Sequence, residues 1–293
     1  MQLLDGKACA QAYKSTIAQQ VLVETSKGIR KPHLAAILVG NDGASETYIA
    51  SKVKTCAELG YESTLLRFES NVSEAELLNA VYKFNANASI DGILVQLPLP
   101  AHINSNTITL AIDPAKDVDG FHPENLGRMM LGLPSFIPAT PKGIMMLLEH
   151  NGIRTAGMHA VVLGRSHIVG SPLSVLLARN AEPGNCTVTL CHSKTKNIQA
   201  ILMQADLLVA ALGKPEFVKA DMVKDGAIVV DVGITRISDT SSPKGYTLKG
   251  DVAFEEVRQK ASWITPVPGG VGAMTIAALM QNTFEAWSRN TRI

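Results

Sequence analysis

The sequence is poor in aromatic residues and has almost no net charge. Phe, Trp and Tyr make up 5% of 293 residues, although 46% are hydrophobic. Aliphatic side chains must therefore fill the cores, as in helices packed on a largely parallel sheet. Lys and Arg number 27 against 26 Asp and Glu. Without a basic excess, we expect neither nucleic acid nor a membrane as a partner, and a small molecule is favoured.

Metal-binding, disulfide and membrane signals are also missing. The four cysteines form no CxxC pair, which indicates reduced thiols rather than a disulfide framework or a zinc site. The seven histidines form no HExxH motif, so we expect no metal, and His33 and His159 at strand starts are interpreted as structural. No secretory leader and no run of about 18 apolar residues is present. These absences predict a cytoplasmic protein.

Short aliphatic runs alternate with helical stretches, which predicts α/β architecture with parallel sheets. In the first half the expected elements are strands at 33–39, 63–68 and 92–97, a helix at 45–59 and a helix from Ser73 with a Ser73–Glu76 capping box. An irregular stretch at 97–140 precedes a helix capped by Thr140. The second half predicts strands at 159–164, 187–191, 206–212 and 227–233, and a final helix at about 275–288.

The length exceeds that of one compact core, so two domains are expected. We place the boundary near residue 139. The first lobe is predicted to contain residues 1–139 together with the C-terminal helix, 275–293, which returns to it. The second lobe, 140–274, is predicted to be a Rossmann-like parallel sheet.

A glycine-rich turn, Gly164-x-Ser166-x-x-x-Gly170, follows an aliphatic strand and precedes an apolar helix. Glycine allows the backbone to approach a pyrophosphate, and the helix N-terminus offers N–H groups to it. The spacing departs from G-x-G-x-x-G, so by itself the turn also fits an ordinary strand-to-helix connection.

Cofactor preference can be predicted from the end of the next strand, where NAD sites usually carry an acid. Here residues 191–195 read Cys-His-Ser-Lys-Thr, without an acid. Arg165, His192 and Ser193 would suit the 2′-phosphate of NADP, although they would also suit a solvated loop.

Tyr48 and Lys52 lie at i and i+4 of a predicted helix and share one face. Short-chain dehydrogenases also have a Tyr-x-x-x-Lys pair, but downstream of the nucleotide turn, whereas this pair lies far upstream. Taken alone, the pair is more typical of a helix surface than of a catalytic site.

Nine segments in a fixed order change that interpretation. They are VGNDGASETYIASK (39–52), DGILVQLPLP (91–100), KDVDGFHPENLGR (116–128), PATPKGI (138–144), GRSHIVGSP (164–172), TVTLCHSKT (187–195), DVGI (231–234), GDV (250–252) and TPVPGGVGAMT (265–275). Together they resemble the bifunctional methylenetetrahydrofolate dehydrogenase/methenyltetrahydrofolate cyclohydrolase family along the whole chain. The resemblance implies a homodimer in one-carbon metabolism and purine biosynthesis, with NADP as cofactor and a folate held between the lobes.

The resemblance also implies roles for individual residues. Lys52 would be the central catalytic group, Gln96 its hydrogen-bonding partner, Tyr48 a stacking surface for the folate ring and Asp119 the anchor of the pterin. The residues implied to bind the cofactor are Gly164, Arg165, Ser166, Gly170, His192, Ser193 and Ile234. Those implied to contact substrate, besides Tyr48 and Asp119, are Pro268, Gly269 and Gly270.

These roles are chemically reasonable. A carboxylate accepts paired N–H groups, a tyrosine face suits a flat heteroaromatic ring, and a shielded lysine can move protons. Alternatively, Asp119 could serve only the turn at Gly120, and Gln96 could merely end a strand.

The chain departs from the family pattern at Gly43, Ala139, Thr235 and Ala273, where Pro, Cys, Asn and Pro are usual. None of these removes a proposed catalytic group, but each affects the fit of substrate or nicotinamide. Two other functions stay open. One is a dehydrogenase of a hydroxy or amino acid, which gives Tyr48 and Asp119 no role. The other is a nucleotide-binding protein without catalytic activity.

Overall fold

The chain forms two compact units in a computed structural model that describes residues 1–242 and 245–291. The Rossmann-like unit contains residues 1–10 and 140–275, and the three-stranded unit contains residues 11–139 and 276–293. The first ten residues thus depart from the prediction that placed 1–139 in one lobe. The reason is β1 (Gln2–Leu3), which pairs in parallel with β11 (Trp263–Ile264). Two-residue strands leave no periodic signal in a sequence.

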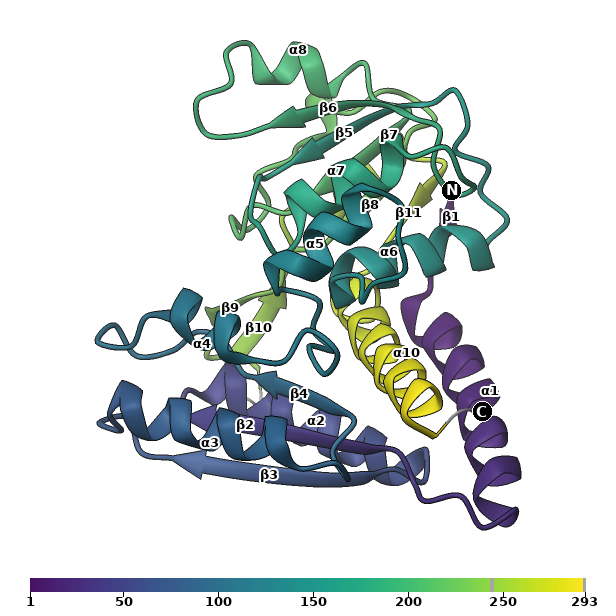
Figure 1. The fold of residues 1–293 in the computed structure, drawn as a ribbon. Helices are drawn as coiled ribbons and strands as arrows, with labels where there is room; N and C mark the ends of the chain where they lie inside the picture. Colours follow the sequence, from purple (N-terminus) through teal and green to yellow (C-terminus); the bar gives the residue numbers. More distant parts are fainter. Residues whose placement is uncertain (243–244, 292–293) are drawn as a thin grey trace. The chain divides into compact units, whose positions relative to one another are not determined.

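The three-stranded unit is built on a parallel sheet with the order β3-β2-β4. Its elements are β2 (His33–Val39), α2 (Gly43–Glu58), β3 (Glu62–Phe68), α3 (Glu74–Ala86), β4 (Gly92–Val95), α4 (Ser105–Ala111) and α5 (Pro123–Met130). The capping box of Ser73 and Glu76 at the start of α3 is confirmed. Aliphatic residues on one face of the sheet, such as Ile37 and Ile93, pack against α3 and α4 (Figure 1).

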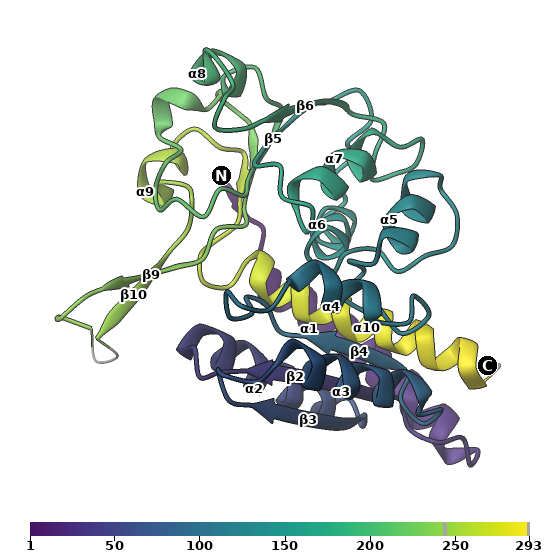
Figure 2. The ribbon, with the colours of Figure 1, turned by 60° about the vertical axis from the view of Figure 1, so that its left-hand side comes forward.

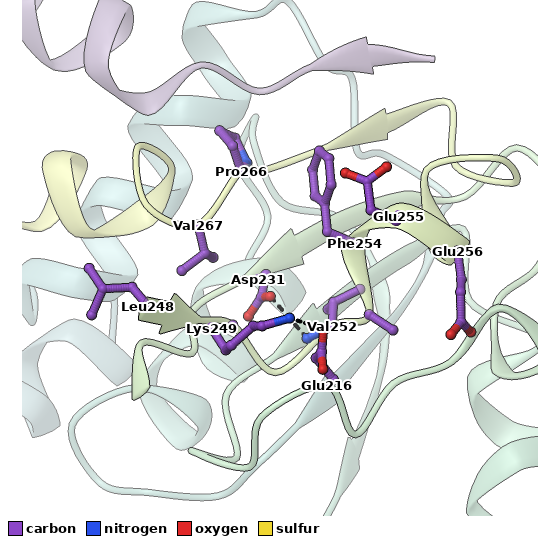
Figure 3. A pocket seen from close by; sticks show the side chains of 12 residues that line it. Glu216, Asp231, Leu248, Lys249, Val252, Phe254, Glu255, Glu256, Pro266 and Val267 are labelled. Carbon is purple, nitrogen blue, oxygen red and sulfur yellow. Dashed lines mark hydrogen bonds and ion pairs between the residues drawn. The ribbon is translucent and has the colours of Figure 1, made fainter. Parts of the chain in front are cut away.

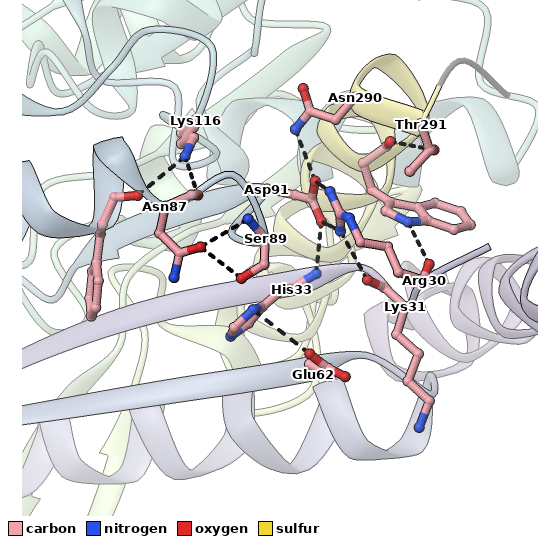
Figure 4. Close-up of polar contacts among 12 residues, drawn as sticks. Arg30, Lys31, His33, Glu62, Asn87, Ser89, Asp91, Lys116, Asn290 and Thr291 are labelled. Carbon is pink, nitrogen blue, oxygen red and sulfur yellow. Dashed lines mark hydrogen bonds and ion pairs between the residues drawn. The ribbon is translucent and has the colours of Figure 1, made fainter.

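A buried ion pair ties the C-terminal helix to this sheet. Asp91, which has no exposed surface, accepts two hydrogen bonds from the Arg30 guanidinium (2.6 and 2.7 Å) and one from Asn290 Nδ2 (2.9 Å) (Figure 4). The Trp287 indole N–H donates to the Arg30 carbonyl oxygen (2.9 Å). Arg30 precedes β2, and Asp91 precedes β4. Residues from 276 onward therefore belong structurally to the three-stranded unit.

The Rossmann-like unit has six parallel strands in the order β1-β11-β8-β7-β5-β6. The predicted strands are present as β5 (His159–Leu163), β6 (Thr187–Cys191), β7 (Leu207–Ala210) and β8 (Ile228–Asp231), and the helices include α7 (Gly170–Ala178), α8 (Ile198–Leu202) and α9 (Phe254–Val257). The order reverses between β5 and β7. In open parallel sheets, ligands bind outside the carboxyl ends of the strands at such a reversal.

Several elements differ from the sequence predictions. The antiparallel hairpin of β9 (Thr235–Ser238) and β10 (Tyr246–Lys249) was not predicted, and Figure 2 shows it extending away from the six-stranded sheet. The irregular stretch contains α4 and α5. Two long helices, α1 (Gly6–Ser26) and α10 (Val271–Thr291), have residues in both units, whereas α6 (Ala139–His150) belongs to the Rossmann-like unit except for Ala139. Because α6 begins at Ala139, Thr140 lies inside its first turn instead of capping it. Within the described residues, no helix is both long and apolar enough to span a membrane.

Candidate active site

Tyr48 and Lys52 lie one turn apart on α2, whose N-terminus is capped by Asp42 through the Ser45 N–H (2.8 Å). Lys52 is only 8% exposed. Tyr48 is half-buried, and burial raises the pKa of its hydroxyl, so the ring stays neutral. The pair is therefore not a solvated helix surface, which was the alternative that the sequence left open.

The Lys52 ammonium donates a hydrogen bond to Gln96 Oε1 (3.0 Å). Gln96 directly follows β4, and its own amide Nε2 donates to the Leu97 carbonyl oxygen (2.7 Å). That second bond orients the amide so that its oxygen faces Lys52. Gln96 thus ends a strand and also fixes the position of the lysine.

Asp117 and Asp119 are two residues apart but have different environments. Asp117 accepts hydrogen bonds from the backbone N–H groups of Phe121 and His122 and from Asn125 Nδ2 (3.3, 2.8 and 3.0 Å). The turn at Gly120 (φ +73°) is therefore organised by Asp117. Within the described residues, the carboxyl group of Asp119 accepts no hydrogen bond and stays available to a ligand.

The Asp119 carboxyl group lies close enough to the Lys52 ammonium for the two to interact electrostatically. Burial raises the pKa of Asp119, the Lys52 ammonium opposes that increase, and the neighbouring Asp117 adds to it. Asp119 also lines a small cavity in the three-stranded unit with Val95, Leu97, Ser105, Ile108, Thr109, Ile112, Asp117 and Phe121. The structure thus brings Lys52, Gln96 and Asp119 together at the carboxyl end of β4.

In the Rossmann-like unit, the glycine-rich turn follows β5 and leads into α7. A β-carbon at Gly164 would overlap the Ala211 carbonyl oxygen, and one at Gly170 would overlap the carbonyl oxygen of Gly164. Both positions therefore exclude every side chain. Val169, the N-cap residue of α7, makes no capping bond with its own side chain, and Ser166 Oγ accepts the N–H groups of Val169 (3.2 Å) and Gly170 (3.5 Å). This geometry fits a dinucleotide pyrophosphate at the reversal point of the sheet.

The end of β6 carries no acid, and the residues predicted to hold a 2′-phosphate are accessible. Arg165 and Ser193 are exposed, and His192 is half-buried. The His192 Nδ1 accepts the Lys194 N–H (3.1 Å), so a neutral ring carries its proton on Nε2 and presents a donor. These groups fit NADP, since each is a donor suited to phosphate.

The other predicted contacts also lie in this unit. Ile234 follows β8 and is 43% exposed, so its side chain is accessible to a cofactor. Gly269 has φ +113°, and its carbonyl oxygen accepts the Lys7 N–H (3.0 Å). A β-carbon at Gly270 would lie 2.7 Å from the Pro266 carbonyl oxygen, and Pro268 is exposed. Pro268, Gly269 and Gly270 therefore belong to a different compact unit from Tyr48 and Asp119.

The four departures occupy different surroundings. Gly43 is the first residue of α2, and Ala139, only 2% exposed, is the first of α6. Thr235 begins β9, and Ala273 lies in the first turn of α10. Histidines at strand starts are structural, as predicted: the His33 and His159 Nε2 atoms contact Thr64 and Thr189 hydroxyls (2.8 and 2.9 Å). Over residues 1–242 and 245–291, no cluster of three metal-ligating side chains occurs.

Sequence reasoning missed two buried carboxylates, Asp231 and Asp251, although they lie in the segments DVGI and GDV. Asp231 lines a pocket of about 420 Å³ in the Rossmann-like unit, beside an ion pair of Lys249 and Glu216 (2.7 Å) (Figure 3). For Asp231, the available signal was an acid at the end of an aliphatic run, whereas Asp251 follows Gly250 and the polar strand β10 and had no such signal.

The Rossmann-like unit has a parallel sheet with a glycine-rich turn at its reversal point. The three-stranded unit of the same chain has a buried lysine–glutamine site. Together these features define a two-unit dinucleotide-dependent enzyme. Residues 138–291 match the NAD(P)-binding domain of tetrahydrofolate dehydrogenase/cyclohydrolase, and residues 4–119 match its catalytic domain. The chain belongs to the tetrahydrofolate dehydrogenase/cyclohydrolase family.

Individual relatives agree with this assignment. The chain is 57% identical over 286 residues to the bifunctional protein FolD of Cytophaga hutchinsonii, covering 98% of this chain and 99% of the relative. A crystal structure of the FolD dehydrogenase/cyclohydrolase from Campylobacter jejuni has 46% identity, full coverage of both chains and a TM-score of 0.92. The Trypanosoma brucei enzyme, solved with NADP cofactor and inhibitor, has 37% identity, coverage of 99% and 98%, and a TM-score of 0.93.

Proposed function

We propose that this chain oxidises 5,10-methylenetetrahydrofolate with NADP and then hydrolyses the methenyl product to 10-formyltetrahydrofolate, at a site organised by Lys52. Family membership across both domains supports the two activities. It disfavours a hydroxy-acid or amino-acid dehydrogenase and a nucleotide-binding protein without activity. The observation that carries the residue assignment is the buried Lys52–Gln96 bond beside the Asp119 carboxyl group, which accepts no hydrogen bond from the described residues.

In the first reaction, NADP held by the glycine-rich turn would supply the acceptor for the hydride that leaves the methylene carbon. The protein's contribution is to hold the substrate. Asp119 is proposed to accept paired N–H groups of the pterin, and Tyr48 to stack on its ring. Gly164, Ser166 and Gly170 are proposed to hold the pyrophosphate.

The 2′-phosphate is proposed to bind Arg165, His192 and Ser193. Ile234 would contact the nicotinamide half of the cofactor. The loop of Pro268, Gly269 and Gly270 is proposed to contact substrate.

In the second reaction, water adds to the cationic methenyl carbon, and the tetrahedral adduct opens by breaking one carbon–nitrogen bond. The water must lose both of its protons as it becomes the formyl oxygen, one being delivered to the departing ring nitrogen and one released to solvent. Lys52 is the proposed proton carrier, because it is shielded from solvent and its ammonium is held by one oriented partner, Gln96.

The direct test mixes the purified protein with methylenetetrahydrofolate and NADP and follows NADPH and methenyl absorbance together. NADPH should appear with little accumulation of the methenyl intermediate. NADPH formation with stoichiometric methenyl accumulation would remove the hydrolytic activity, and no NADPH would remove both.

Three finer properties are also proposed. We infer that the protein is a homodimer, that it works in the cytoplasm, and that its one-carbon metabolism serves purine biosynthesis. Sedimentation equilibrium tests the assembly directly. A mass of twice 31.2 kDa is expected, and a single-chain mass at assay concentrations would contradict it.

A further inference from the structure

Two buried carboxylates connect the loops at the carboxyl edge of the six-stranded sheet. Asp251, with no exposed surface, follows β10 after Gly250, and Asp231, 3% exposed, ends β8. Neither has a role in the function proposed above. Buried carboxylates are costly unless hydrogen bonds compensate for lost water, so their partners show what they stabilise.

Asp251 fixes the loop that follows β7. Its carboxyl oxygens accept the consecutive backbone N–H groups of Leu212, Gly213 and Lys214, the latter two at 2.9 and 2.7 Å. The residue before them, Ala211, carries the carbonyl oxygen that packs against Gly164 of the glycine-rich turn. Asp251 therefore holds the surface on which the proposed pyrophosphate turn rests.

Asp231 fixes the other side of the same edge. It accepts the backbone N–H groups of Gly233 (2.9 Å), Asp251 (2.8 Å) and Val252 (2.9 Å), the last visible in Figure 3. Gly233 immediately precedes Ile234. One carboxyl group thus holds both the proposed nicotinamide contact and the backbone of the second carboxylate.

The two carboxyl groups are packed so closely against glycines that neither can move without displacing the backbone. A β-carbon at Gly233 would overlap the Asp251 carboxyl group, and one at Gly250 would overlap Asp231 Oδ2. Burial raises the pKa of Asp231 to about 7, although the N–H groups of Asp251 and Val252 act in the opposite direction. Apolar side chains often stabilise a protein core as well as buried charged groups do. Stability alone therefore does not explain a carboxyl group at this buried position.

We propose that Asp251 and Asp231 are positioning residues for the dinucleotide. They fix the distance between the glycine-rich turn and the turn that carries Ile234. Those two turns are proposed to contact the part of the cofactor that NADP and NAD share. The inference rests on the proposed function for its cofactor, and on the hydrogen bonds above for its residues.

The test uses Asp251→Asn in the full chain, with NADP and NAD each titrated by calorimetry. Asparagine keeps the shape but turns an amide N–H₂ toward backbone N–H groups. The Kd values for both cofactors should rise by the same factor, at least about tenfold, which corresponds to one charge-assisted hydrogen bond. The kcat for hydrolysis of directly supplied methenyltetrahydrofolate should be unchanged, because the proposed proton carrier, Lys52, lies in the other unit.

Asp206→Asn is the matched control. Asp206 lies at the amino edge of the same sheet and accepts the His159 N–H (2.9 Å), so its loss should lower the melting temperature without changing either Kd. If Asp251→Asn does not fold, Gly250→Ala decides the question, since it displaces Asp231 while keeping both carboxylates.

Three results would overturn the proposal: unchanged Kd values in a folded variant, a change for NADP but not NAD, or loss of hydrolysis in parallel with binding. The first would make the carboxylates structural only. The proposed function fails separately, if the unmodified protein binds NADP but turns over no folate, and in that case the titrations still decide the positioning role.

Discussion

The two units hold their proposed functional groups in opposite ways. In the three-stranded unit, buried side chains are fixed by other side chains, as Lys52 is by Gln96. In the Rossmann-like unit, exposed side chains such as Arg165 project from a turn that packs closely at Gly164 against Ala211. Asp251 holds the backbone N–H groups that directly follow Ala211. Chemistry that moves a proton benefits from shielding, whereas a phosphate can be bound at the surface by fixed N–H groups and a cation.

The largest expected effect tests the buried side of this comparison. Lys52→Met should lower cyclohydrolase kcat at least roughly a hundredfold, the low end for a general acid–base group. Dehydrogenase activity should fall less, because positioning by Tyr48 and Asp119 remains. Both half-reactions are measured on one preparation.

Lys54→Met is its matched control, since Lys54 lies on the same helix with a side chain 79% exposed. It should leave both activities unchanged. Equal losses of the two activities in Lys52→Met would make Lys52 a positioning group.

The next effect separates the two neighbouring aspartates. Asp119→Ala should raise the Kd for folate by on the order of 10- to 100-fold, the value of one or two charge-assisted hydrogen bonds, and leave NADP binding intact. Asp117→Ala should instead lower the free energy of unfolding by roughly 1–3 kcal/mol, because it leaves buried donors unpaired. Folate titration and urea unfolding of both variants measure this. Unchanged folate affinity in Asp119→Ala would reduce it to a loop residue.

A smaller effect on cofactor preference is expected from the exposed residues of the Rossmann-like unit. Arg165→Ala should narrow the preference for NADP over NAD by about tenfold, the low end for an exposed charge-assisted contact. Arg179→Ala, at the other end of α7, is the control and should leave the preference unchanged. Equal affinity of the unmodified protein for NADP and NAD would contradict the assignment of Arg165 to the 2′-phosphate.

The smallest effect is a pH dependence of folate binding. Because the pKa of Asp119 is raised, part of the group is protonated above the pH at which an ordinary Asp is ionised. Folate affinity should therefore still increase with pH above the ordinary Asp pKa of ~3.9, where an unshifted carboxyl group is already ionised. Asp119→Asn should abolish this slope. A slope that survives in Asp119→Asn would assign it to another group.

Much of the fold follows from sequence patterns. Aliphatic runs ending in glycine or polar residues located β2, β5 and β8, and the Ser73–Glu76 spacing located the start of α3. β1 was not predictable, because it has only two residues. The start of α10 was also missed, because the helix begins at Val271, four residues before the expected start and inside a sequence rich in glycine. Local patterns cannot show pairing partners so distant along the chain.

The site was predictable only in part, for a related reason. Tyr48 and Lys52 share a helix face by spacing alone, but the burial of Lys52 and its bond to Gln96 depend on how the fold brings the residue after β4 to α2. The different environments of Asp117 and Asp119 depend on Asn125, a residue with no sequence signal. Asp231 and Asp251 were missed because their partners are backbone N–H groups, which no side-chain pattern reveals.

The most direct test of this account supplies methenyltetrahydrofolate without NADP and compares its hydrolysis by Lys52→Met and Arg165→Ala with that of the unmodified protein. The account predicts that Arg165→Ala hydrolyses the substrate at the unmodified rate while Lys52→Met loses at least roughly a hundredfold. Hydrolysis that persists in Lys52→Met, or that falls equally in both variants, would contradict it.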